Sequence, residues 1–166
     1  MPIVVKPMET DAEIRGKAFV HWRGWQETYP GMMSQAYLDA MTLEKCEENA
    51  FRWLDNILVA KDGDRVVGFV GYGKSRDGLP DTGEIFALYV LSEYHGTGLG
   101  QRLLEAALDQ LSLYHRTCLW ALRDNARAIR FYEKYGFCRD GAEKYVARLE
   151  AAGIRMVRQR DTAPNK

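Results

Sequence analysis

The residues with the clearest capacity for chemistry lie in the stretch "LYVLSEYHGTGLGQRLLEAAL", residues 88–108. There an apolar run is followed by Gly96, Gly98 and Gly100 and then by a strongly amphipathic segment. A glycine-rich turn between a strand and a helix exposes backbone N–H groups that have no intrahelical partner, and the helix dipole adds partial positive charge where they converge. The stretch therefore predicts an anion-binding turn suited to phosphate.

Two better-known phosphate motifs do not fit this turn. The dinucleotide fingerprint requires a glycine at the position that Gln101 occupies, and a Walker loop ends in Gly-Lys-Ser/Thr, which "GLGQRL" lacks. From the glycines alone, the alternative is an ordinary strand-to-helix loop.

Alternating strands and helices are expected around the turn. Apolar spacing from Leu99 onward changes to that of a helix. Strands are predicted at 3–7, in a hairpin over 56–74 that turns at Asp62-Gly63, and at 83–91, 116–123, 142–150 and 153–160. Helices are predicted from Thr10 or Asp11 to about Tyr29, over 34–54 as a second, bent segment, from Leu99, and over 125–137 with Gly136 closing it. This order indicates a mixed α/β fold.

Composition narrows the class of protein. The 166 residues, 46% of them hydrophobic, fit one domain over residues 1–160, with a tail at 161–166 that we expect to be disordered. Lysine plus arginine (23) balance aspartate plus glutamate (23), which argues against charge-driven binding to nucleic acid or membrane. Three scattered cysteines suggest a reducing compartment. With no basic leader and no run of ~20 apolar residues, a cytoplasmic location is expected.

Two segments resemble motifs of the GNAT superfamily of acyl-CoA-dependent N-acetyltransferases. "HGTGLG" resembles the family's Arg/Gln-x-x-Gly-x-Gly/Ala signature after an apolar strand, with His95 in the first place. "DNARAIRFYEKYGF" resembles the later motif, in which an asparagine opens a helix, a tyrosine follows two turns on, and Tyr/Leu-Gly-Phe ends it. The two motifs stand in the family's order, and the resemblance spans residues 3–160.

The resemblance implies a central, mostly antiparallel sheet, flanked by helices and splayed near residues 88–90, where acetyl-CoA enters. The backbone of residues 95–100 would wrap the pyrophosphate, the strand at 88–90 would pair with the pantetheine arm, and side chains in the first helical turn would reach phosphate. The expected coenzyme-binding residues are Leu88, Tyr89, Val90, His95, Gly96, Thr97, Gly98, Leu99, Gly100, Gln101, Arg102 and Asn125.

By the same resemblance, Tyr132 would be the general acid beside the thioester sulfur and Asn125 would hydrogen-bond the coenzyme. Read without the family, Asn125 is a helix N-cap and Tyr132 a buried aromatic of an amphipathic helix. A phenol titrates near ~10 and an alkyl thiol near ~8.5, so full protonation of the thiolate by tyrosine is uphill by roughly 2 kcal/mol. Tyr132 is therefore expected chiefly to donate a hydrogen bond to the departing sulfur.

The acceptor amine must lose a proton before it attacks the thioester, because only its neutral form is nucleophilic. Glu84 is the candidate base, directly or through a water; the alternative is an exposed charge at a strand edge. Some relatives place a glutamate on the next strand, where this chain has Trp120 or Ala121. Backbone N–H groups near residues 88–90 would polarise the carbonyl, and no metal is expected.

The N-terminal helix is expected to shape the acceptor site through Trp22, Trp25, Glu27 and Tyr29, although such an aromatic stripe is also typical of core packing. A small-molecule or polyamine amine is the favoured acceptor, with a protein N-terminus as a further option. The alternative function is a coenzyme-A-binding sensor or regulatory module without turnover. The segment "GIRMVRQR" is a candidate edge strand for a homodimer.

His95 departs from the Arg or Gln of the family signature. An unperturbed histidine, with a pKa near ~6.5, gains charge only on the acid side of neutrality. If its side chain touches phosphate, acetyl-CoA should bind more tightly at pH 6 than at pH 8, and His95→Gln should flatten that dependence. Otherwise the glycine backbone alone holds the anion.

Overall fold

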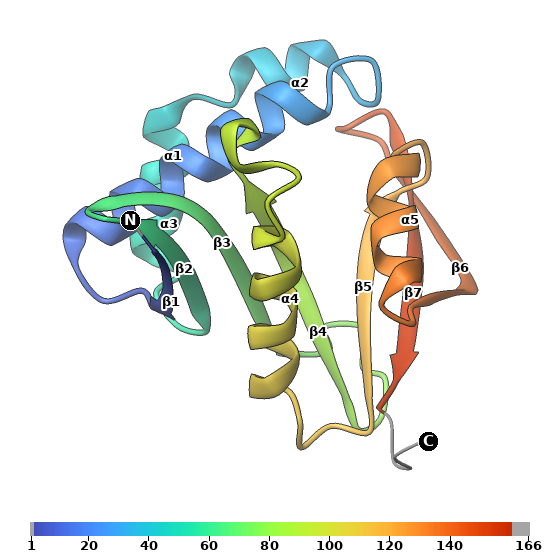
Figure 1. Ribbon diagram of the computed structural model, residues 1–166. Coiled ribbons are helices and arrows are strands. Elements are labelled where there is room, and N and C mark those ends of the chain that lie inside the picture. The colour runs from blue at the N-terminus through green and yellow to red at the C-terminus, as the bar shows by residue number, and fades with distance from the viewer. Residues whose placement is uncertain (1, 161–166) are drawn as a thin grey trace.

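The computed structural model describes residues 2–160, which form a seven-stranded sheet and five α-helices (Figure 1). The strand order is β1-β2-β3-β4-β5-β7-β6. The strands are β1 (Ile3–Pro7), β2 (Ile57–Asp62), β3 (Arg65–Lys74), β4 (Thr82–Val90), β5 (Arg116–Leu122), β6 (Cys138–Val146) and β7 (Ala151–Gln159). The helices are α1 (Asp11–Thr28), α2 (Gln35–Ala40), α3 (Leu43–Arg52), α4 (Leu99–Gln110) and α5 (Ala126–Lys134), with a 3-10 turn over Ser92–Tyr94.

The centre of the sheet is split between β4 and β5. These two strands run parallel and pair only from Thr82↔Arg116 to Ile85↔Leu119, although both continue beyond that point. Figure 1 shows them diverging, with α4 and α5 on either side of the gap. All other strand pairs are antiparallel. The predicted mixed α/β fold with a mostly antiparallel, splayed sheet is confirmed.

A β-bulge lies in β4 just where the split begins. Gly71 pairs with Ala87 and Tyr72 pairs with Ile85, so Phe86 has no partner on β3. A bulge bends its strand and increases its local twist. The bulge at Phe86 therefore helps to turn the end of β4 away from β5.

Helices cover both faces of the sheet. Side chains alternate between the faces of a strand, and neighbouring residues of β3 meet different helices. A Cβ placed on Gly68 would lie 3.0 Å from Leu103 of α4, whereas the Phe69 ring lies 4.8 Å from Lys17 Nζ of α1. The sheet is thus sandwiched between α4 and α1, and its two faces contribute different walls to the site.

A buried carboxylate fixes the start of α1 to the sheet. Thr10 Oγ1 accepts a hydrogen bond from the Glu13 N–H at 3.1 Å, and Glu13 Oε1 accepts one from the Thr10 N–H at 3.1 Å, which makes a capping box. Lys6 of β1 and Lys61 of β2 both bind Glu13, whose side chain is 4% exposed. Burial alone would raise the pKa of Glu13, but these hydrogen bonds outweigh it and lower the pKa to about 2.

Several local expectations need correction. The predicted bent helical segment is two helices, since Met41 between α2 and α3 has an extended conformation. The hairpin turns at residues 63–64, because Asp62 already pairs with Arg65. The strand expected at 142–150 begins at Cys138, and β7 lies inside the sheet between β5 and β6. The "GIRMVRQR" segment is therefore not an edge strand. The expected disordered tail, 161–166, lies outside the described residues.

Candidate active site

A cleft of about 930 Å³ opens where β4 and β5 separate. Its walls come from the end of β4, the turn before α4, the first turns of α5, the end of α1, β5 and the β6–β7 hairpin. Most residues predicted for the site line this cleft: Trp25, Glu27, Tyr29, Glu84, Leu88, Tyr89, Val90, His95, Gly96, Gly98, Leu99, Gly100, Gln101, Asn125 and Tyr132. Segments far apart in the sequence thus meet at one site.

The glycine turn presents the start of α4 to the cleft. Gly98 is the N-cap of α4 and, like Gly96, has a positive φ (84° and 79°) that glycine adopts without strain. No other side chain lies within 4 Å of where a Cβ would stand at either position, so the backbone angle, not crowding, calls for glycine there. No side chain caps the first N–H groups of α4, so these donors remain available, as an anion-binding turn requires.

The main chain at the end of β4 is also available to a ligand. The Leu91 N–H donates to Val67 O, while Val90 stands opposite Gly68. Backbone groups alternate in direction along an antiparallel strand, so those of Leu88 and Val90 point away from β3 and toward the cleft. Because β5 has diverged at this level, an extended ligand has room to pair with this edge.

His95 uses its ring on that same edge. His95 Nε2 lies 2.9 Å from Val90 O and, in the tautomer that carries hydrogen there, donates to it. The ring therefore braces the turn against β4, and its other nitrogen is left for a ligand or solvent.

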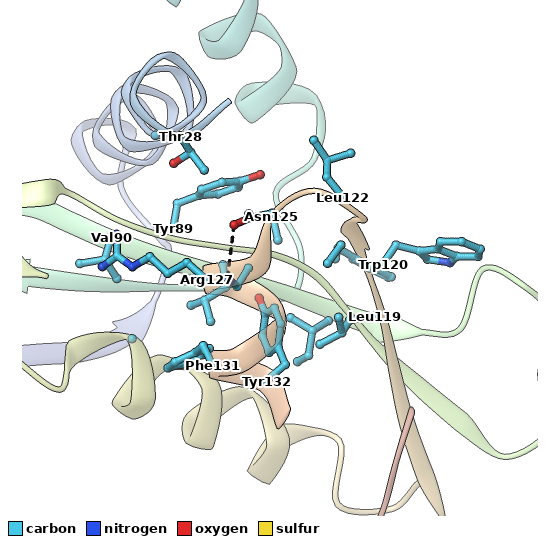
Figure 2. Close-up of a pocket in the computed structure, with 18 of the residues that line it drawn as sticks. Thr28, Tyr89, Val90, Leu119, Trp120, Leu122, Asn125, Arg127, Phe131 and Tyr132 are labelled. Atoms are coloured by element: carbon cyan, nitrogen blue, oxygen red, sulfur yellow. Dashed lines mark hydrogen bonds between the residues drawn. The ribbon is translucent and has the colours of Figure 1, made fainter. Parts of the chain in front are cut away.

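Two predicted coenzyme residues, Thr97 and Arg102, do not line the cleft. The Thr97 hydroxyl donates to Tyr94 O at 2.6 Å and so closes the turn, while Arg102 Nη2 donates to Ile3 O at 3.0 Å on β1. Arg127 was missed by the sequence reasoning. It lines the cleft, and its side chain extends from α5 toward Val90 (Figure 2).

Asn125 and Tyr132 reach the cleft from α5. Asn125 caps the helix, since its Oδ1 accepts from the Ala128 N–H at 3.2 Å, and no described residue accepts from its amide nitrogen. The Tyr132 ring packs on Phe131 and Phe137, and its hydroxyl points into the cleft on the side of Asn125 and Tyr89 (Figure 2). Burial, with the nearby Tyr29, raises the pKa of Tyr132 above its usual range, so it is a neutral donor near pH 7.

Aromatic residues of α1 and β4 form the opposite wall. The Tyr29 and Tyr89 hydroxyls are 2.9 Å apart, and the Trp25 ring packs edge-on against Tyr29. Trp22 does not line the cleft; it lies a turn before Trp25 and packs on Phe19 at a centroid distance of 6.0 Å. The expected aromatic stripe is therefore divided between cleft and core.

Glu84 is buried in the wall near the base of the split, with a side chain 1% exposed. It accepts three hydrogen bonds from one residue: Arg76 N donates at 2.9 Å, Nη2 at 2.7 Å and Nε at 3.3 Å. The Arg76 guanidinium also stacks on Phe86, 4.4 Å from its ring centroid. Glu84 is thus not an exposed edge charge, and its carboxylate is already paired.

A second charged cluster centres on Trp120. Glu84 stands opposite Cys118 across the parallel pair, so Trp120, two residues on, projects from the same face as Glu84. Trp120 Nε1 donates to Asp77 Oδ2 at 2.8 Å, and Arg155 Nη1 donates to the same oxygen at 3.2 Å. Burial would raise the pKa of Asp77, but these two partners and nearby positive charge lower it. No local sequence pattern indicates this cluster.

The far end of the cleft is closed by a contact between the two halves of the chain. The Ser34 N–H, after α1, donates to Leu149 O of the β6–β7 turn at 2.6 Å. Met33, Leu38 and Ala151 form a small buried cluster beside it. The N-terminal helices and the β6–β7 hairpin therefore meet over the cleft, as Figure 1 shows.

Residues 19–137 match the sequence pattern of the acetyltransferase (GNAT) family. The chain belongs to this family. It is accordingly an acyltransferase that uses acetyl-CoA. It is 35% identical over 120 residues to an uncharacterized N-acetyltransferase of Archaeoglobus fulgidus, covering 66% of this chain and 79% of that one. To the N-acetyltransferase YuaI of Bacillus subtilis it is 28% identical over 149 residues, covering 87% and 83%.

The fold is shared with solved members of the GNAT class. The PaiA N-acetyltransferase of Thermoplasma acidophilum, solved in complex with coenzyme A, superposes with a TM-score of 0.73 at 21% identity and covers 96% of this chain and 99% of that chain. Within residues 2–160, no helix is long and apolar enough to cross a membrane. The same residues contain no group of three or more His, Cys, Asp or Glu side chains placed to hold a metal ion.

Proposed function

We propose that this GNAT enzyme transfers the acetyl group of acetyl-CoA directly to a primary amine bound in the cleft. One observation carries the proposal: the anion-binding turn, the free edge of β4 and the Tyr132 hydroxyl all face a single cleft. We call the turn, the end of β4 at residues 88–90 and α5 the cofactor side. The acceptor side consists of the end of α1, the Arg76–Glu84 pair, Asp77, Trp120 and the β6–β7 hairpin.

On the cofactor side, the pyrophosphate would lie on the N–H groups that open α4, within reach of Arg127. The pantetheine arm would run along Leu88–Val90, with the Asn125 amide nitrogen donating to it. Because the pyrophosphate lies at the Val90 end, this places the thioester beyond Leu88, toward the bulge at Phe86 and the Tyr132 hydroxyl. The coenzyme-A complex of the PaiA relative supports this choice of ligand.

The reaction needs a bond from nitrogen to the acetyl carbon and loss of the carbon–sulfur bond. Negative charge passes to the carbonyl oxygen in the tetrahedral intermediate and then to the leaving sulfur. The Leu88 backbone N–H, which points toward the cleft, would stabilise the oxygen, and the Tyr132 hydroxyl would stabilise the sulfur. Because the pKa of Tyr132 is raised, a hydrogen bond to the thiolate is favoured over full proton transfer.

The amine proton needs an acceptor, and Glu84 retains limited capacity for it. A carboxylate offers about four lone-pair positions, of which Arg76 occupies three. The buried side chain would act through the remaining position and a water in the cleft. A glutamine at this position removes the charge and keeps the shape. We therefore expect Glu84→Gln to lower kcat about tenfold or more near neutral pH and less at high pH, where free amine is abundant.

The proposal is tested by a thiol-release assay with acetyl-CoA across a panel of amines, followed by mass spectrometry of the product. Amine-dependent release of coenzyme A with a matching N-acetyl product supports it. If folded protein binds acetyl-CoA, as measured by isothermal titration, yet releases thiol with no amine of the panel, the proposed transfer is wrong and a binding module is the better account.

A further inference from the structure

The carboxylates on the acceptor side are all engaged by other residues. Glu27, Asp77 and Glu84 line this part of the cleft. Each accepts at least two hydrogen bonds from the protein. Arg23 and Ser92 donate to Glu27. Arg155 and Trp120 donate to Asp77, and Arg76 alone donates to Glu84. Each of the three therefore has an arginine partner, although Arg23 also pairs with Glu93 and Arg155 also pairs with Asp140.

Two cations on the same side have no such partners. Lys144, on β6, and Arg148, in the β6–β7 turn, both line the cleft. Among residues 2–160, no carboxylate lies within 4.0 Å of either charged group. The charge of Lys144 helps to lower the pKa of Asp77 from a longer distance, but Asp77 Oδ2 accepts its hydrogen bonds from Arg155 and Trp120. Lys144 and Arg148 are thus cations at the cleft that no carboxylate of the described residues holds in a direct ion pair.

Lys144 packs against the ring of Trp120. Its Nζ lies 4.7 Å from the centroid of the Trp120 ring, a cation–π contact. Trp120 is fixed at its edge by the hydrogen bond to Asp77, and Gly153 lies beneath the ring, where a Cβ would be 3.4 Å from it. The exposed Lys144 side chain therefore has one packing partner beside the cleft, the Trp120 ring.

Arg148 is positioned by the turn that carries it. The neighbouring Leu149 carbonyl accepts the hydrogen bond from Ser34 described above, which ties the turn to the N-terminal helices. Lys144 and Arg148 thus approach the cleft from one hairpin, β6–β7, on the side opposite the anion-binding turn.

We propose that the acceptor of this enzyme carries a carboxylate near its amine, and that Lys144 and Arg148 bind that carboxylate. This inference rests on the acetyl transfer proposed above. Charge-assisted hydrogen bonds to a carboxylate give both affinity and orientation, which would direct the amine toward the thioester. A polyamine would instead bring a second ammonium toward two cations that have no directly paired carboxylate, so this site discriminates against the polycationic acceptors that the sequence favoured.

The test compares matched acceptors in the thiol-release assay. Each pair has the same primary amine and carries a carboxylate in one member and a carboxamide in the other; a diamine of similar length is the third acceptor. Each kcat/KM is divided by the fraction of the acceptor whose amine is unprotonated at the assay pH. The corrected kcat/KM of the carboxylate should be at least about tenfold above those of the carboxamide and the diamine. Equal or faster turnover of the carboxamide or the diamine overturns the inference.

Variants identify the residues responsible for the preference. In the Lys144→Gln, Arg148→Gln double variant, the carboxylate-to-carboxamide ratio should fall toward one. Arg139→Gln is the matched control, because Arg139 is an exposed cation on β6 outside the cleft, and it should keep the wild-type ratio. A double variant that folds and keeps the full ratio contradicts the assignment.

Salt gives a second measurement that needs no variant. Raising the ionic strength to about 1 M should reduce the carboxylate-to-carboxamide ratio of the wild-type enzyme, because partly exposed charges are then screened. A ratio that does not change with salt contradicts recognition by these cations. Turnover without a carboxylate preference overturns this inference alone, whereas no turnover with any amine overturns the acetyl transfer and this inference with it.

Discussion

The cofactor side and the acceptor side of the cleft are built by different means. The cofactor side offers mainly backbone groups: the start of α4 after Gly98 and, on the edge of β4 that faces the cleft, those of Leu88 and the Val90 N–H. The acceptor side offers side chains from separate segments, held by ion pairs and stacking around Trp120 and Glu84. A backbone site depends on conformation and tolerates side-chain change, while a side-chain site changes specificity with each substitution. The first suits an invariant coenzyme, and the second suits an acceptor peculiar to each enzyme.

The largest expected effect is on stability and concerns Glu13, which fixes the start of α1 to the sheet. The end of α1 forms part of the acceptor side. The pKa of Glu13 is lowered from 4.5 to about 2 in the folded protein. Its stabilisation is therefore complete above pH 4.5 and is lost as the pH falls from there toward 2. At pH 7, Glu13→Gln should lower the free energy of unfolding by about 3 kcal/mol, as measured by urea denaturation.

The difference between wild type and Glu13→Gln should shrink on acidification toward pH 3. Glu9→Gln is the control, because the Glu9 side chain is 66% exposed and pairs only at the surface. A constant difference from pH 7 to pH 3 would show that packing, not charge, fixes this end of α1.

A smaller effect is expected from a substitution that tests whether main-chain groups at the start of α4 bind the coenzyme. Gly98→Ala places a Cβ at φ +84°, which costs about 1–2 kcal/mol and displaces the N–H groups that open α4. We expect acetyl-CoA to bind about tenfold more weakly in isothermal titration. Gly78→Ala is the matched control, since Gly78 has φ +73° and equally open surroundings but lies outside the cleft. Equal losses of acetyl-CoA affinity in the two variants would break the contrast between the two sides.

The smallest effect concerns His95, the departure from the family signature. Its ring is hydrogen-bonded to Val90 O, and the proposed anion site consists of the main-chain N–H groups that open α4. We therefore expect acetyl-CoA dissociation constants at pH 6 and pH 8 to differ by less than about threefold in wild type and in His95→Gln alike. A wild-type protein that binds much more tightly at pH 6, with the dependence lost in the variant, would show that the side chain holds phosphate.

Much of the fold and of the cofactor side could be predicted because their signals are local. The N-caps at Thr10, Ser34 and Thr42 each precede their helix, as their side chains predict. The strand, glycine turn and helix over residues 84–110 are consecutive in the chain, so spacing alone places the turn at the end of the strand. The same local logic failed at Arg102, whose side chain finds a partner on β1, nearly a hundred positions away in the sequence.

The acceptor side could not be predicted because long-range pairing assembles it. Arg76 and Asp77 follow β3, Trp120 lies on β5 and Lys144 on β6, and no spacing rule connects them. The start of β6 was missed for a related reason: "CRDGA" has the composition of a turn, but it is a strand whose register with β7 shifts between Arg139 and Glu143, with Gly141 at φ +93°. Only Cys138 and Arg139 of this stretch pair with β7, while Asp140, Gly141 and Ala142 bulge out of register, so the local turn preference persists inside the strand.

Tyr132 tests the central claim most directly, because the proposed transfer places the thioester sulfur beside its hydroxyl. The measurement is a paired determination, for wild type and Tyr132→Phe, of acetyl-CoA affinity by isothermal titration and of kcat with a competent amine. Loss of one hydrogen bond to the leaving sulfur predicts a kcat about 100-fold lower, with the dissociation constant for acetyl-CoA changed less than about threefold. A Tyr132→Phe enzyme with unchanged kcat and undiminished coenzyme binding would contradict the account.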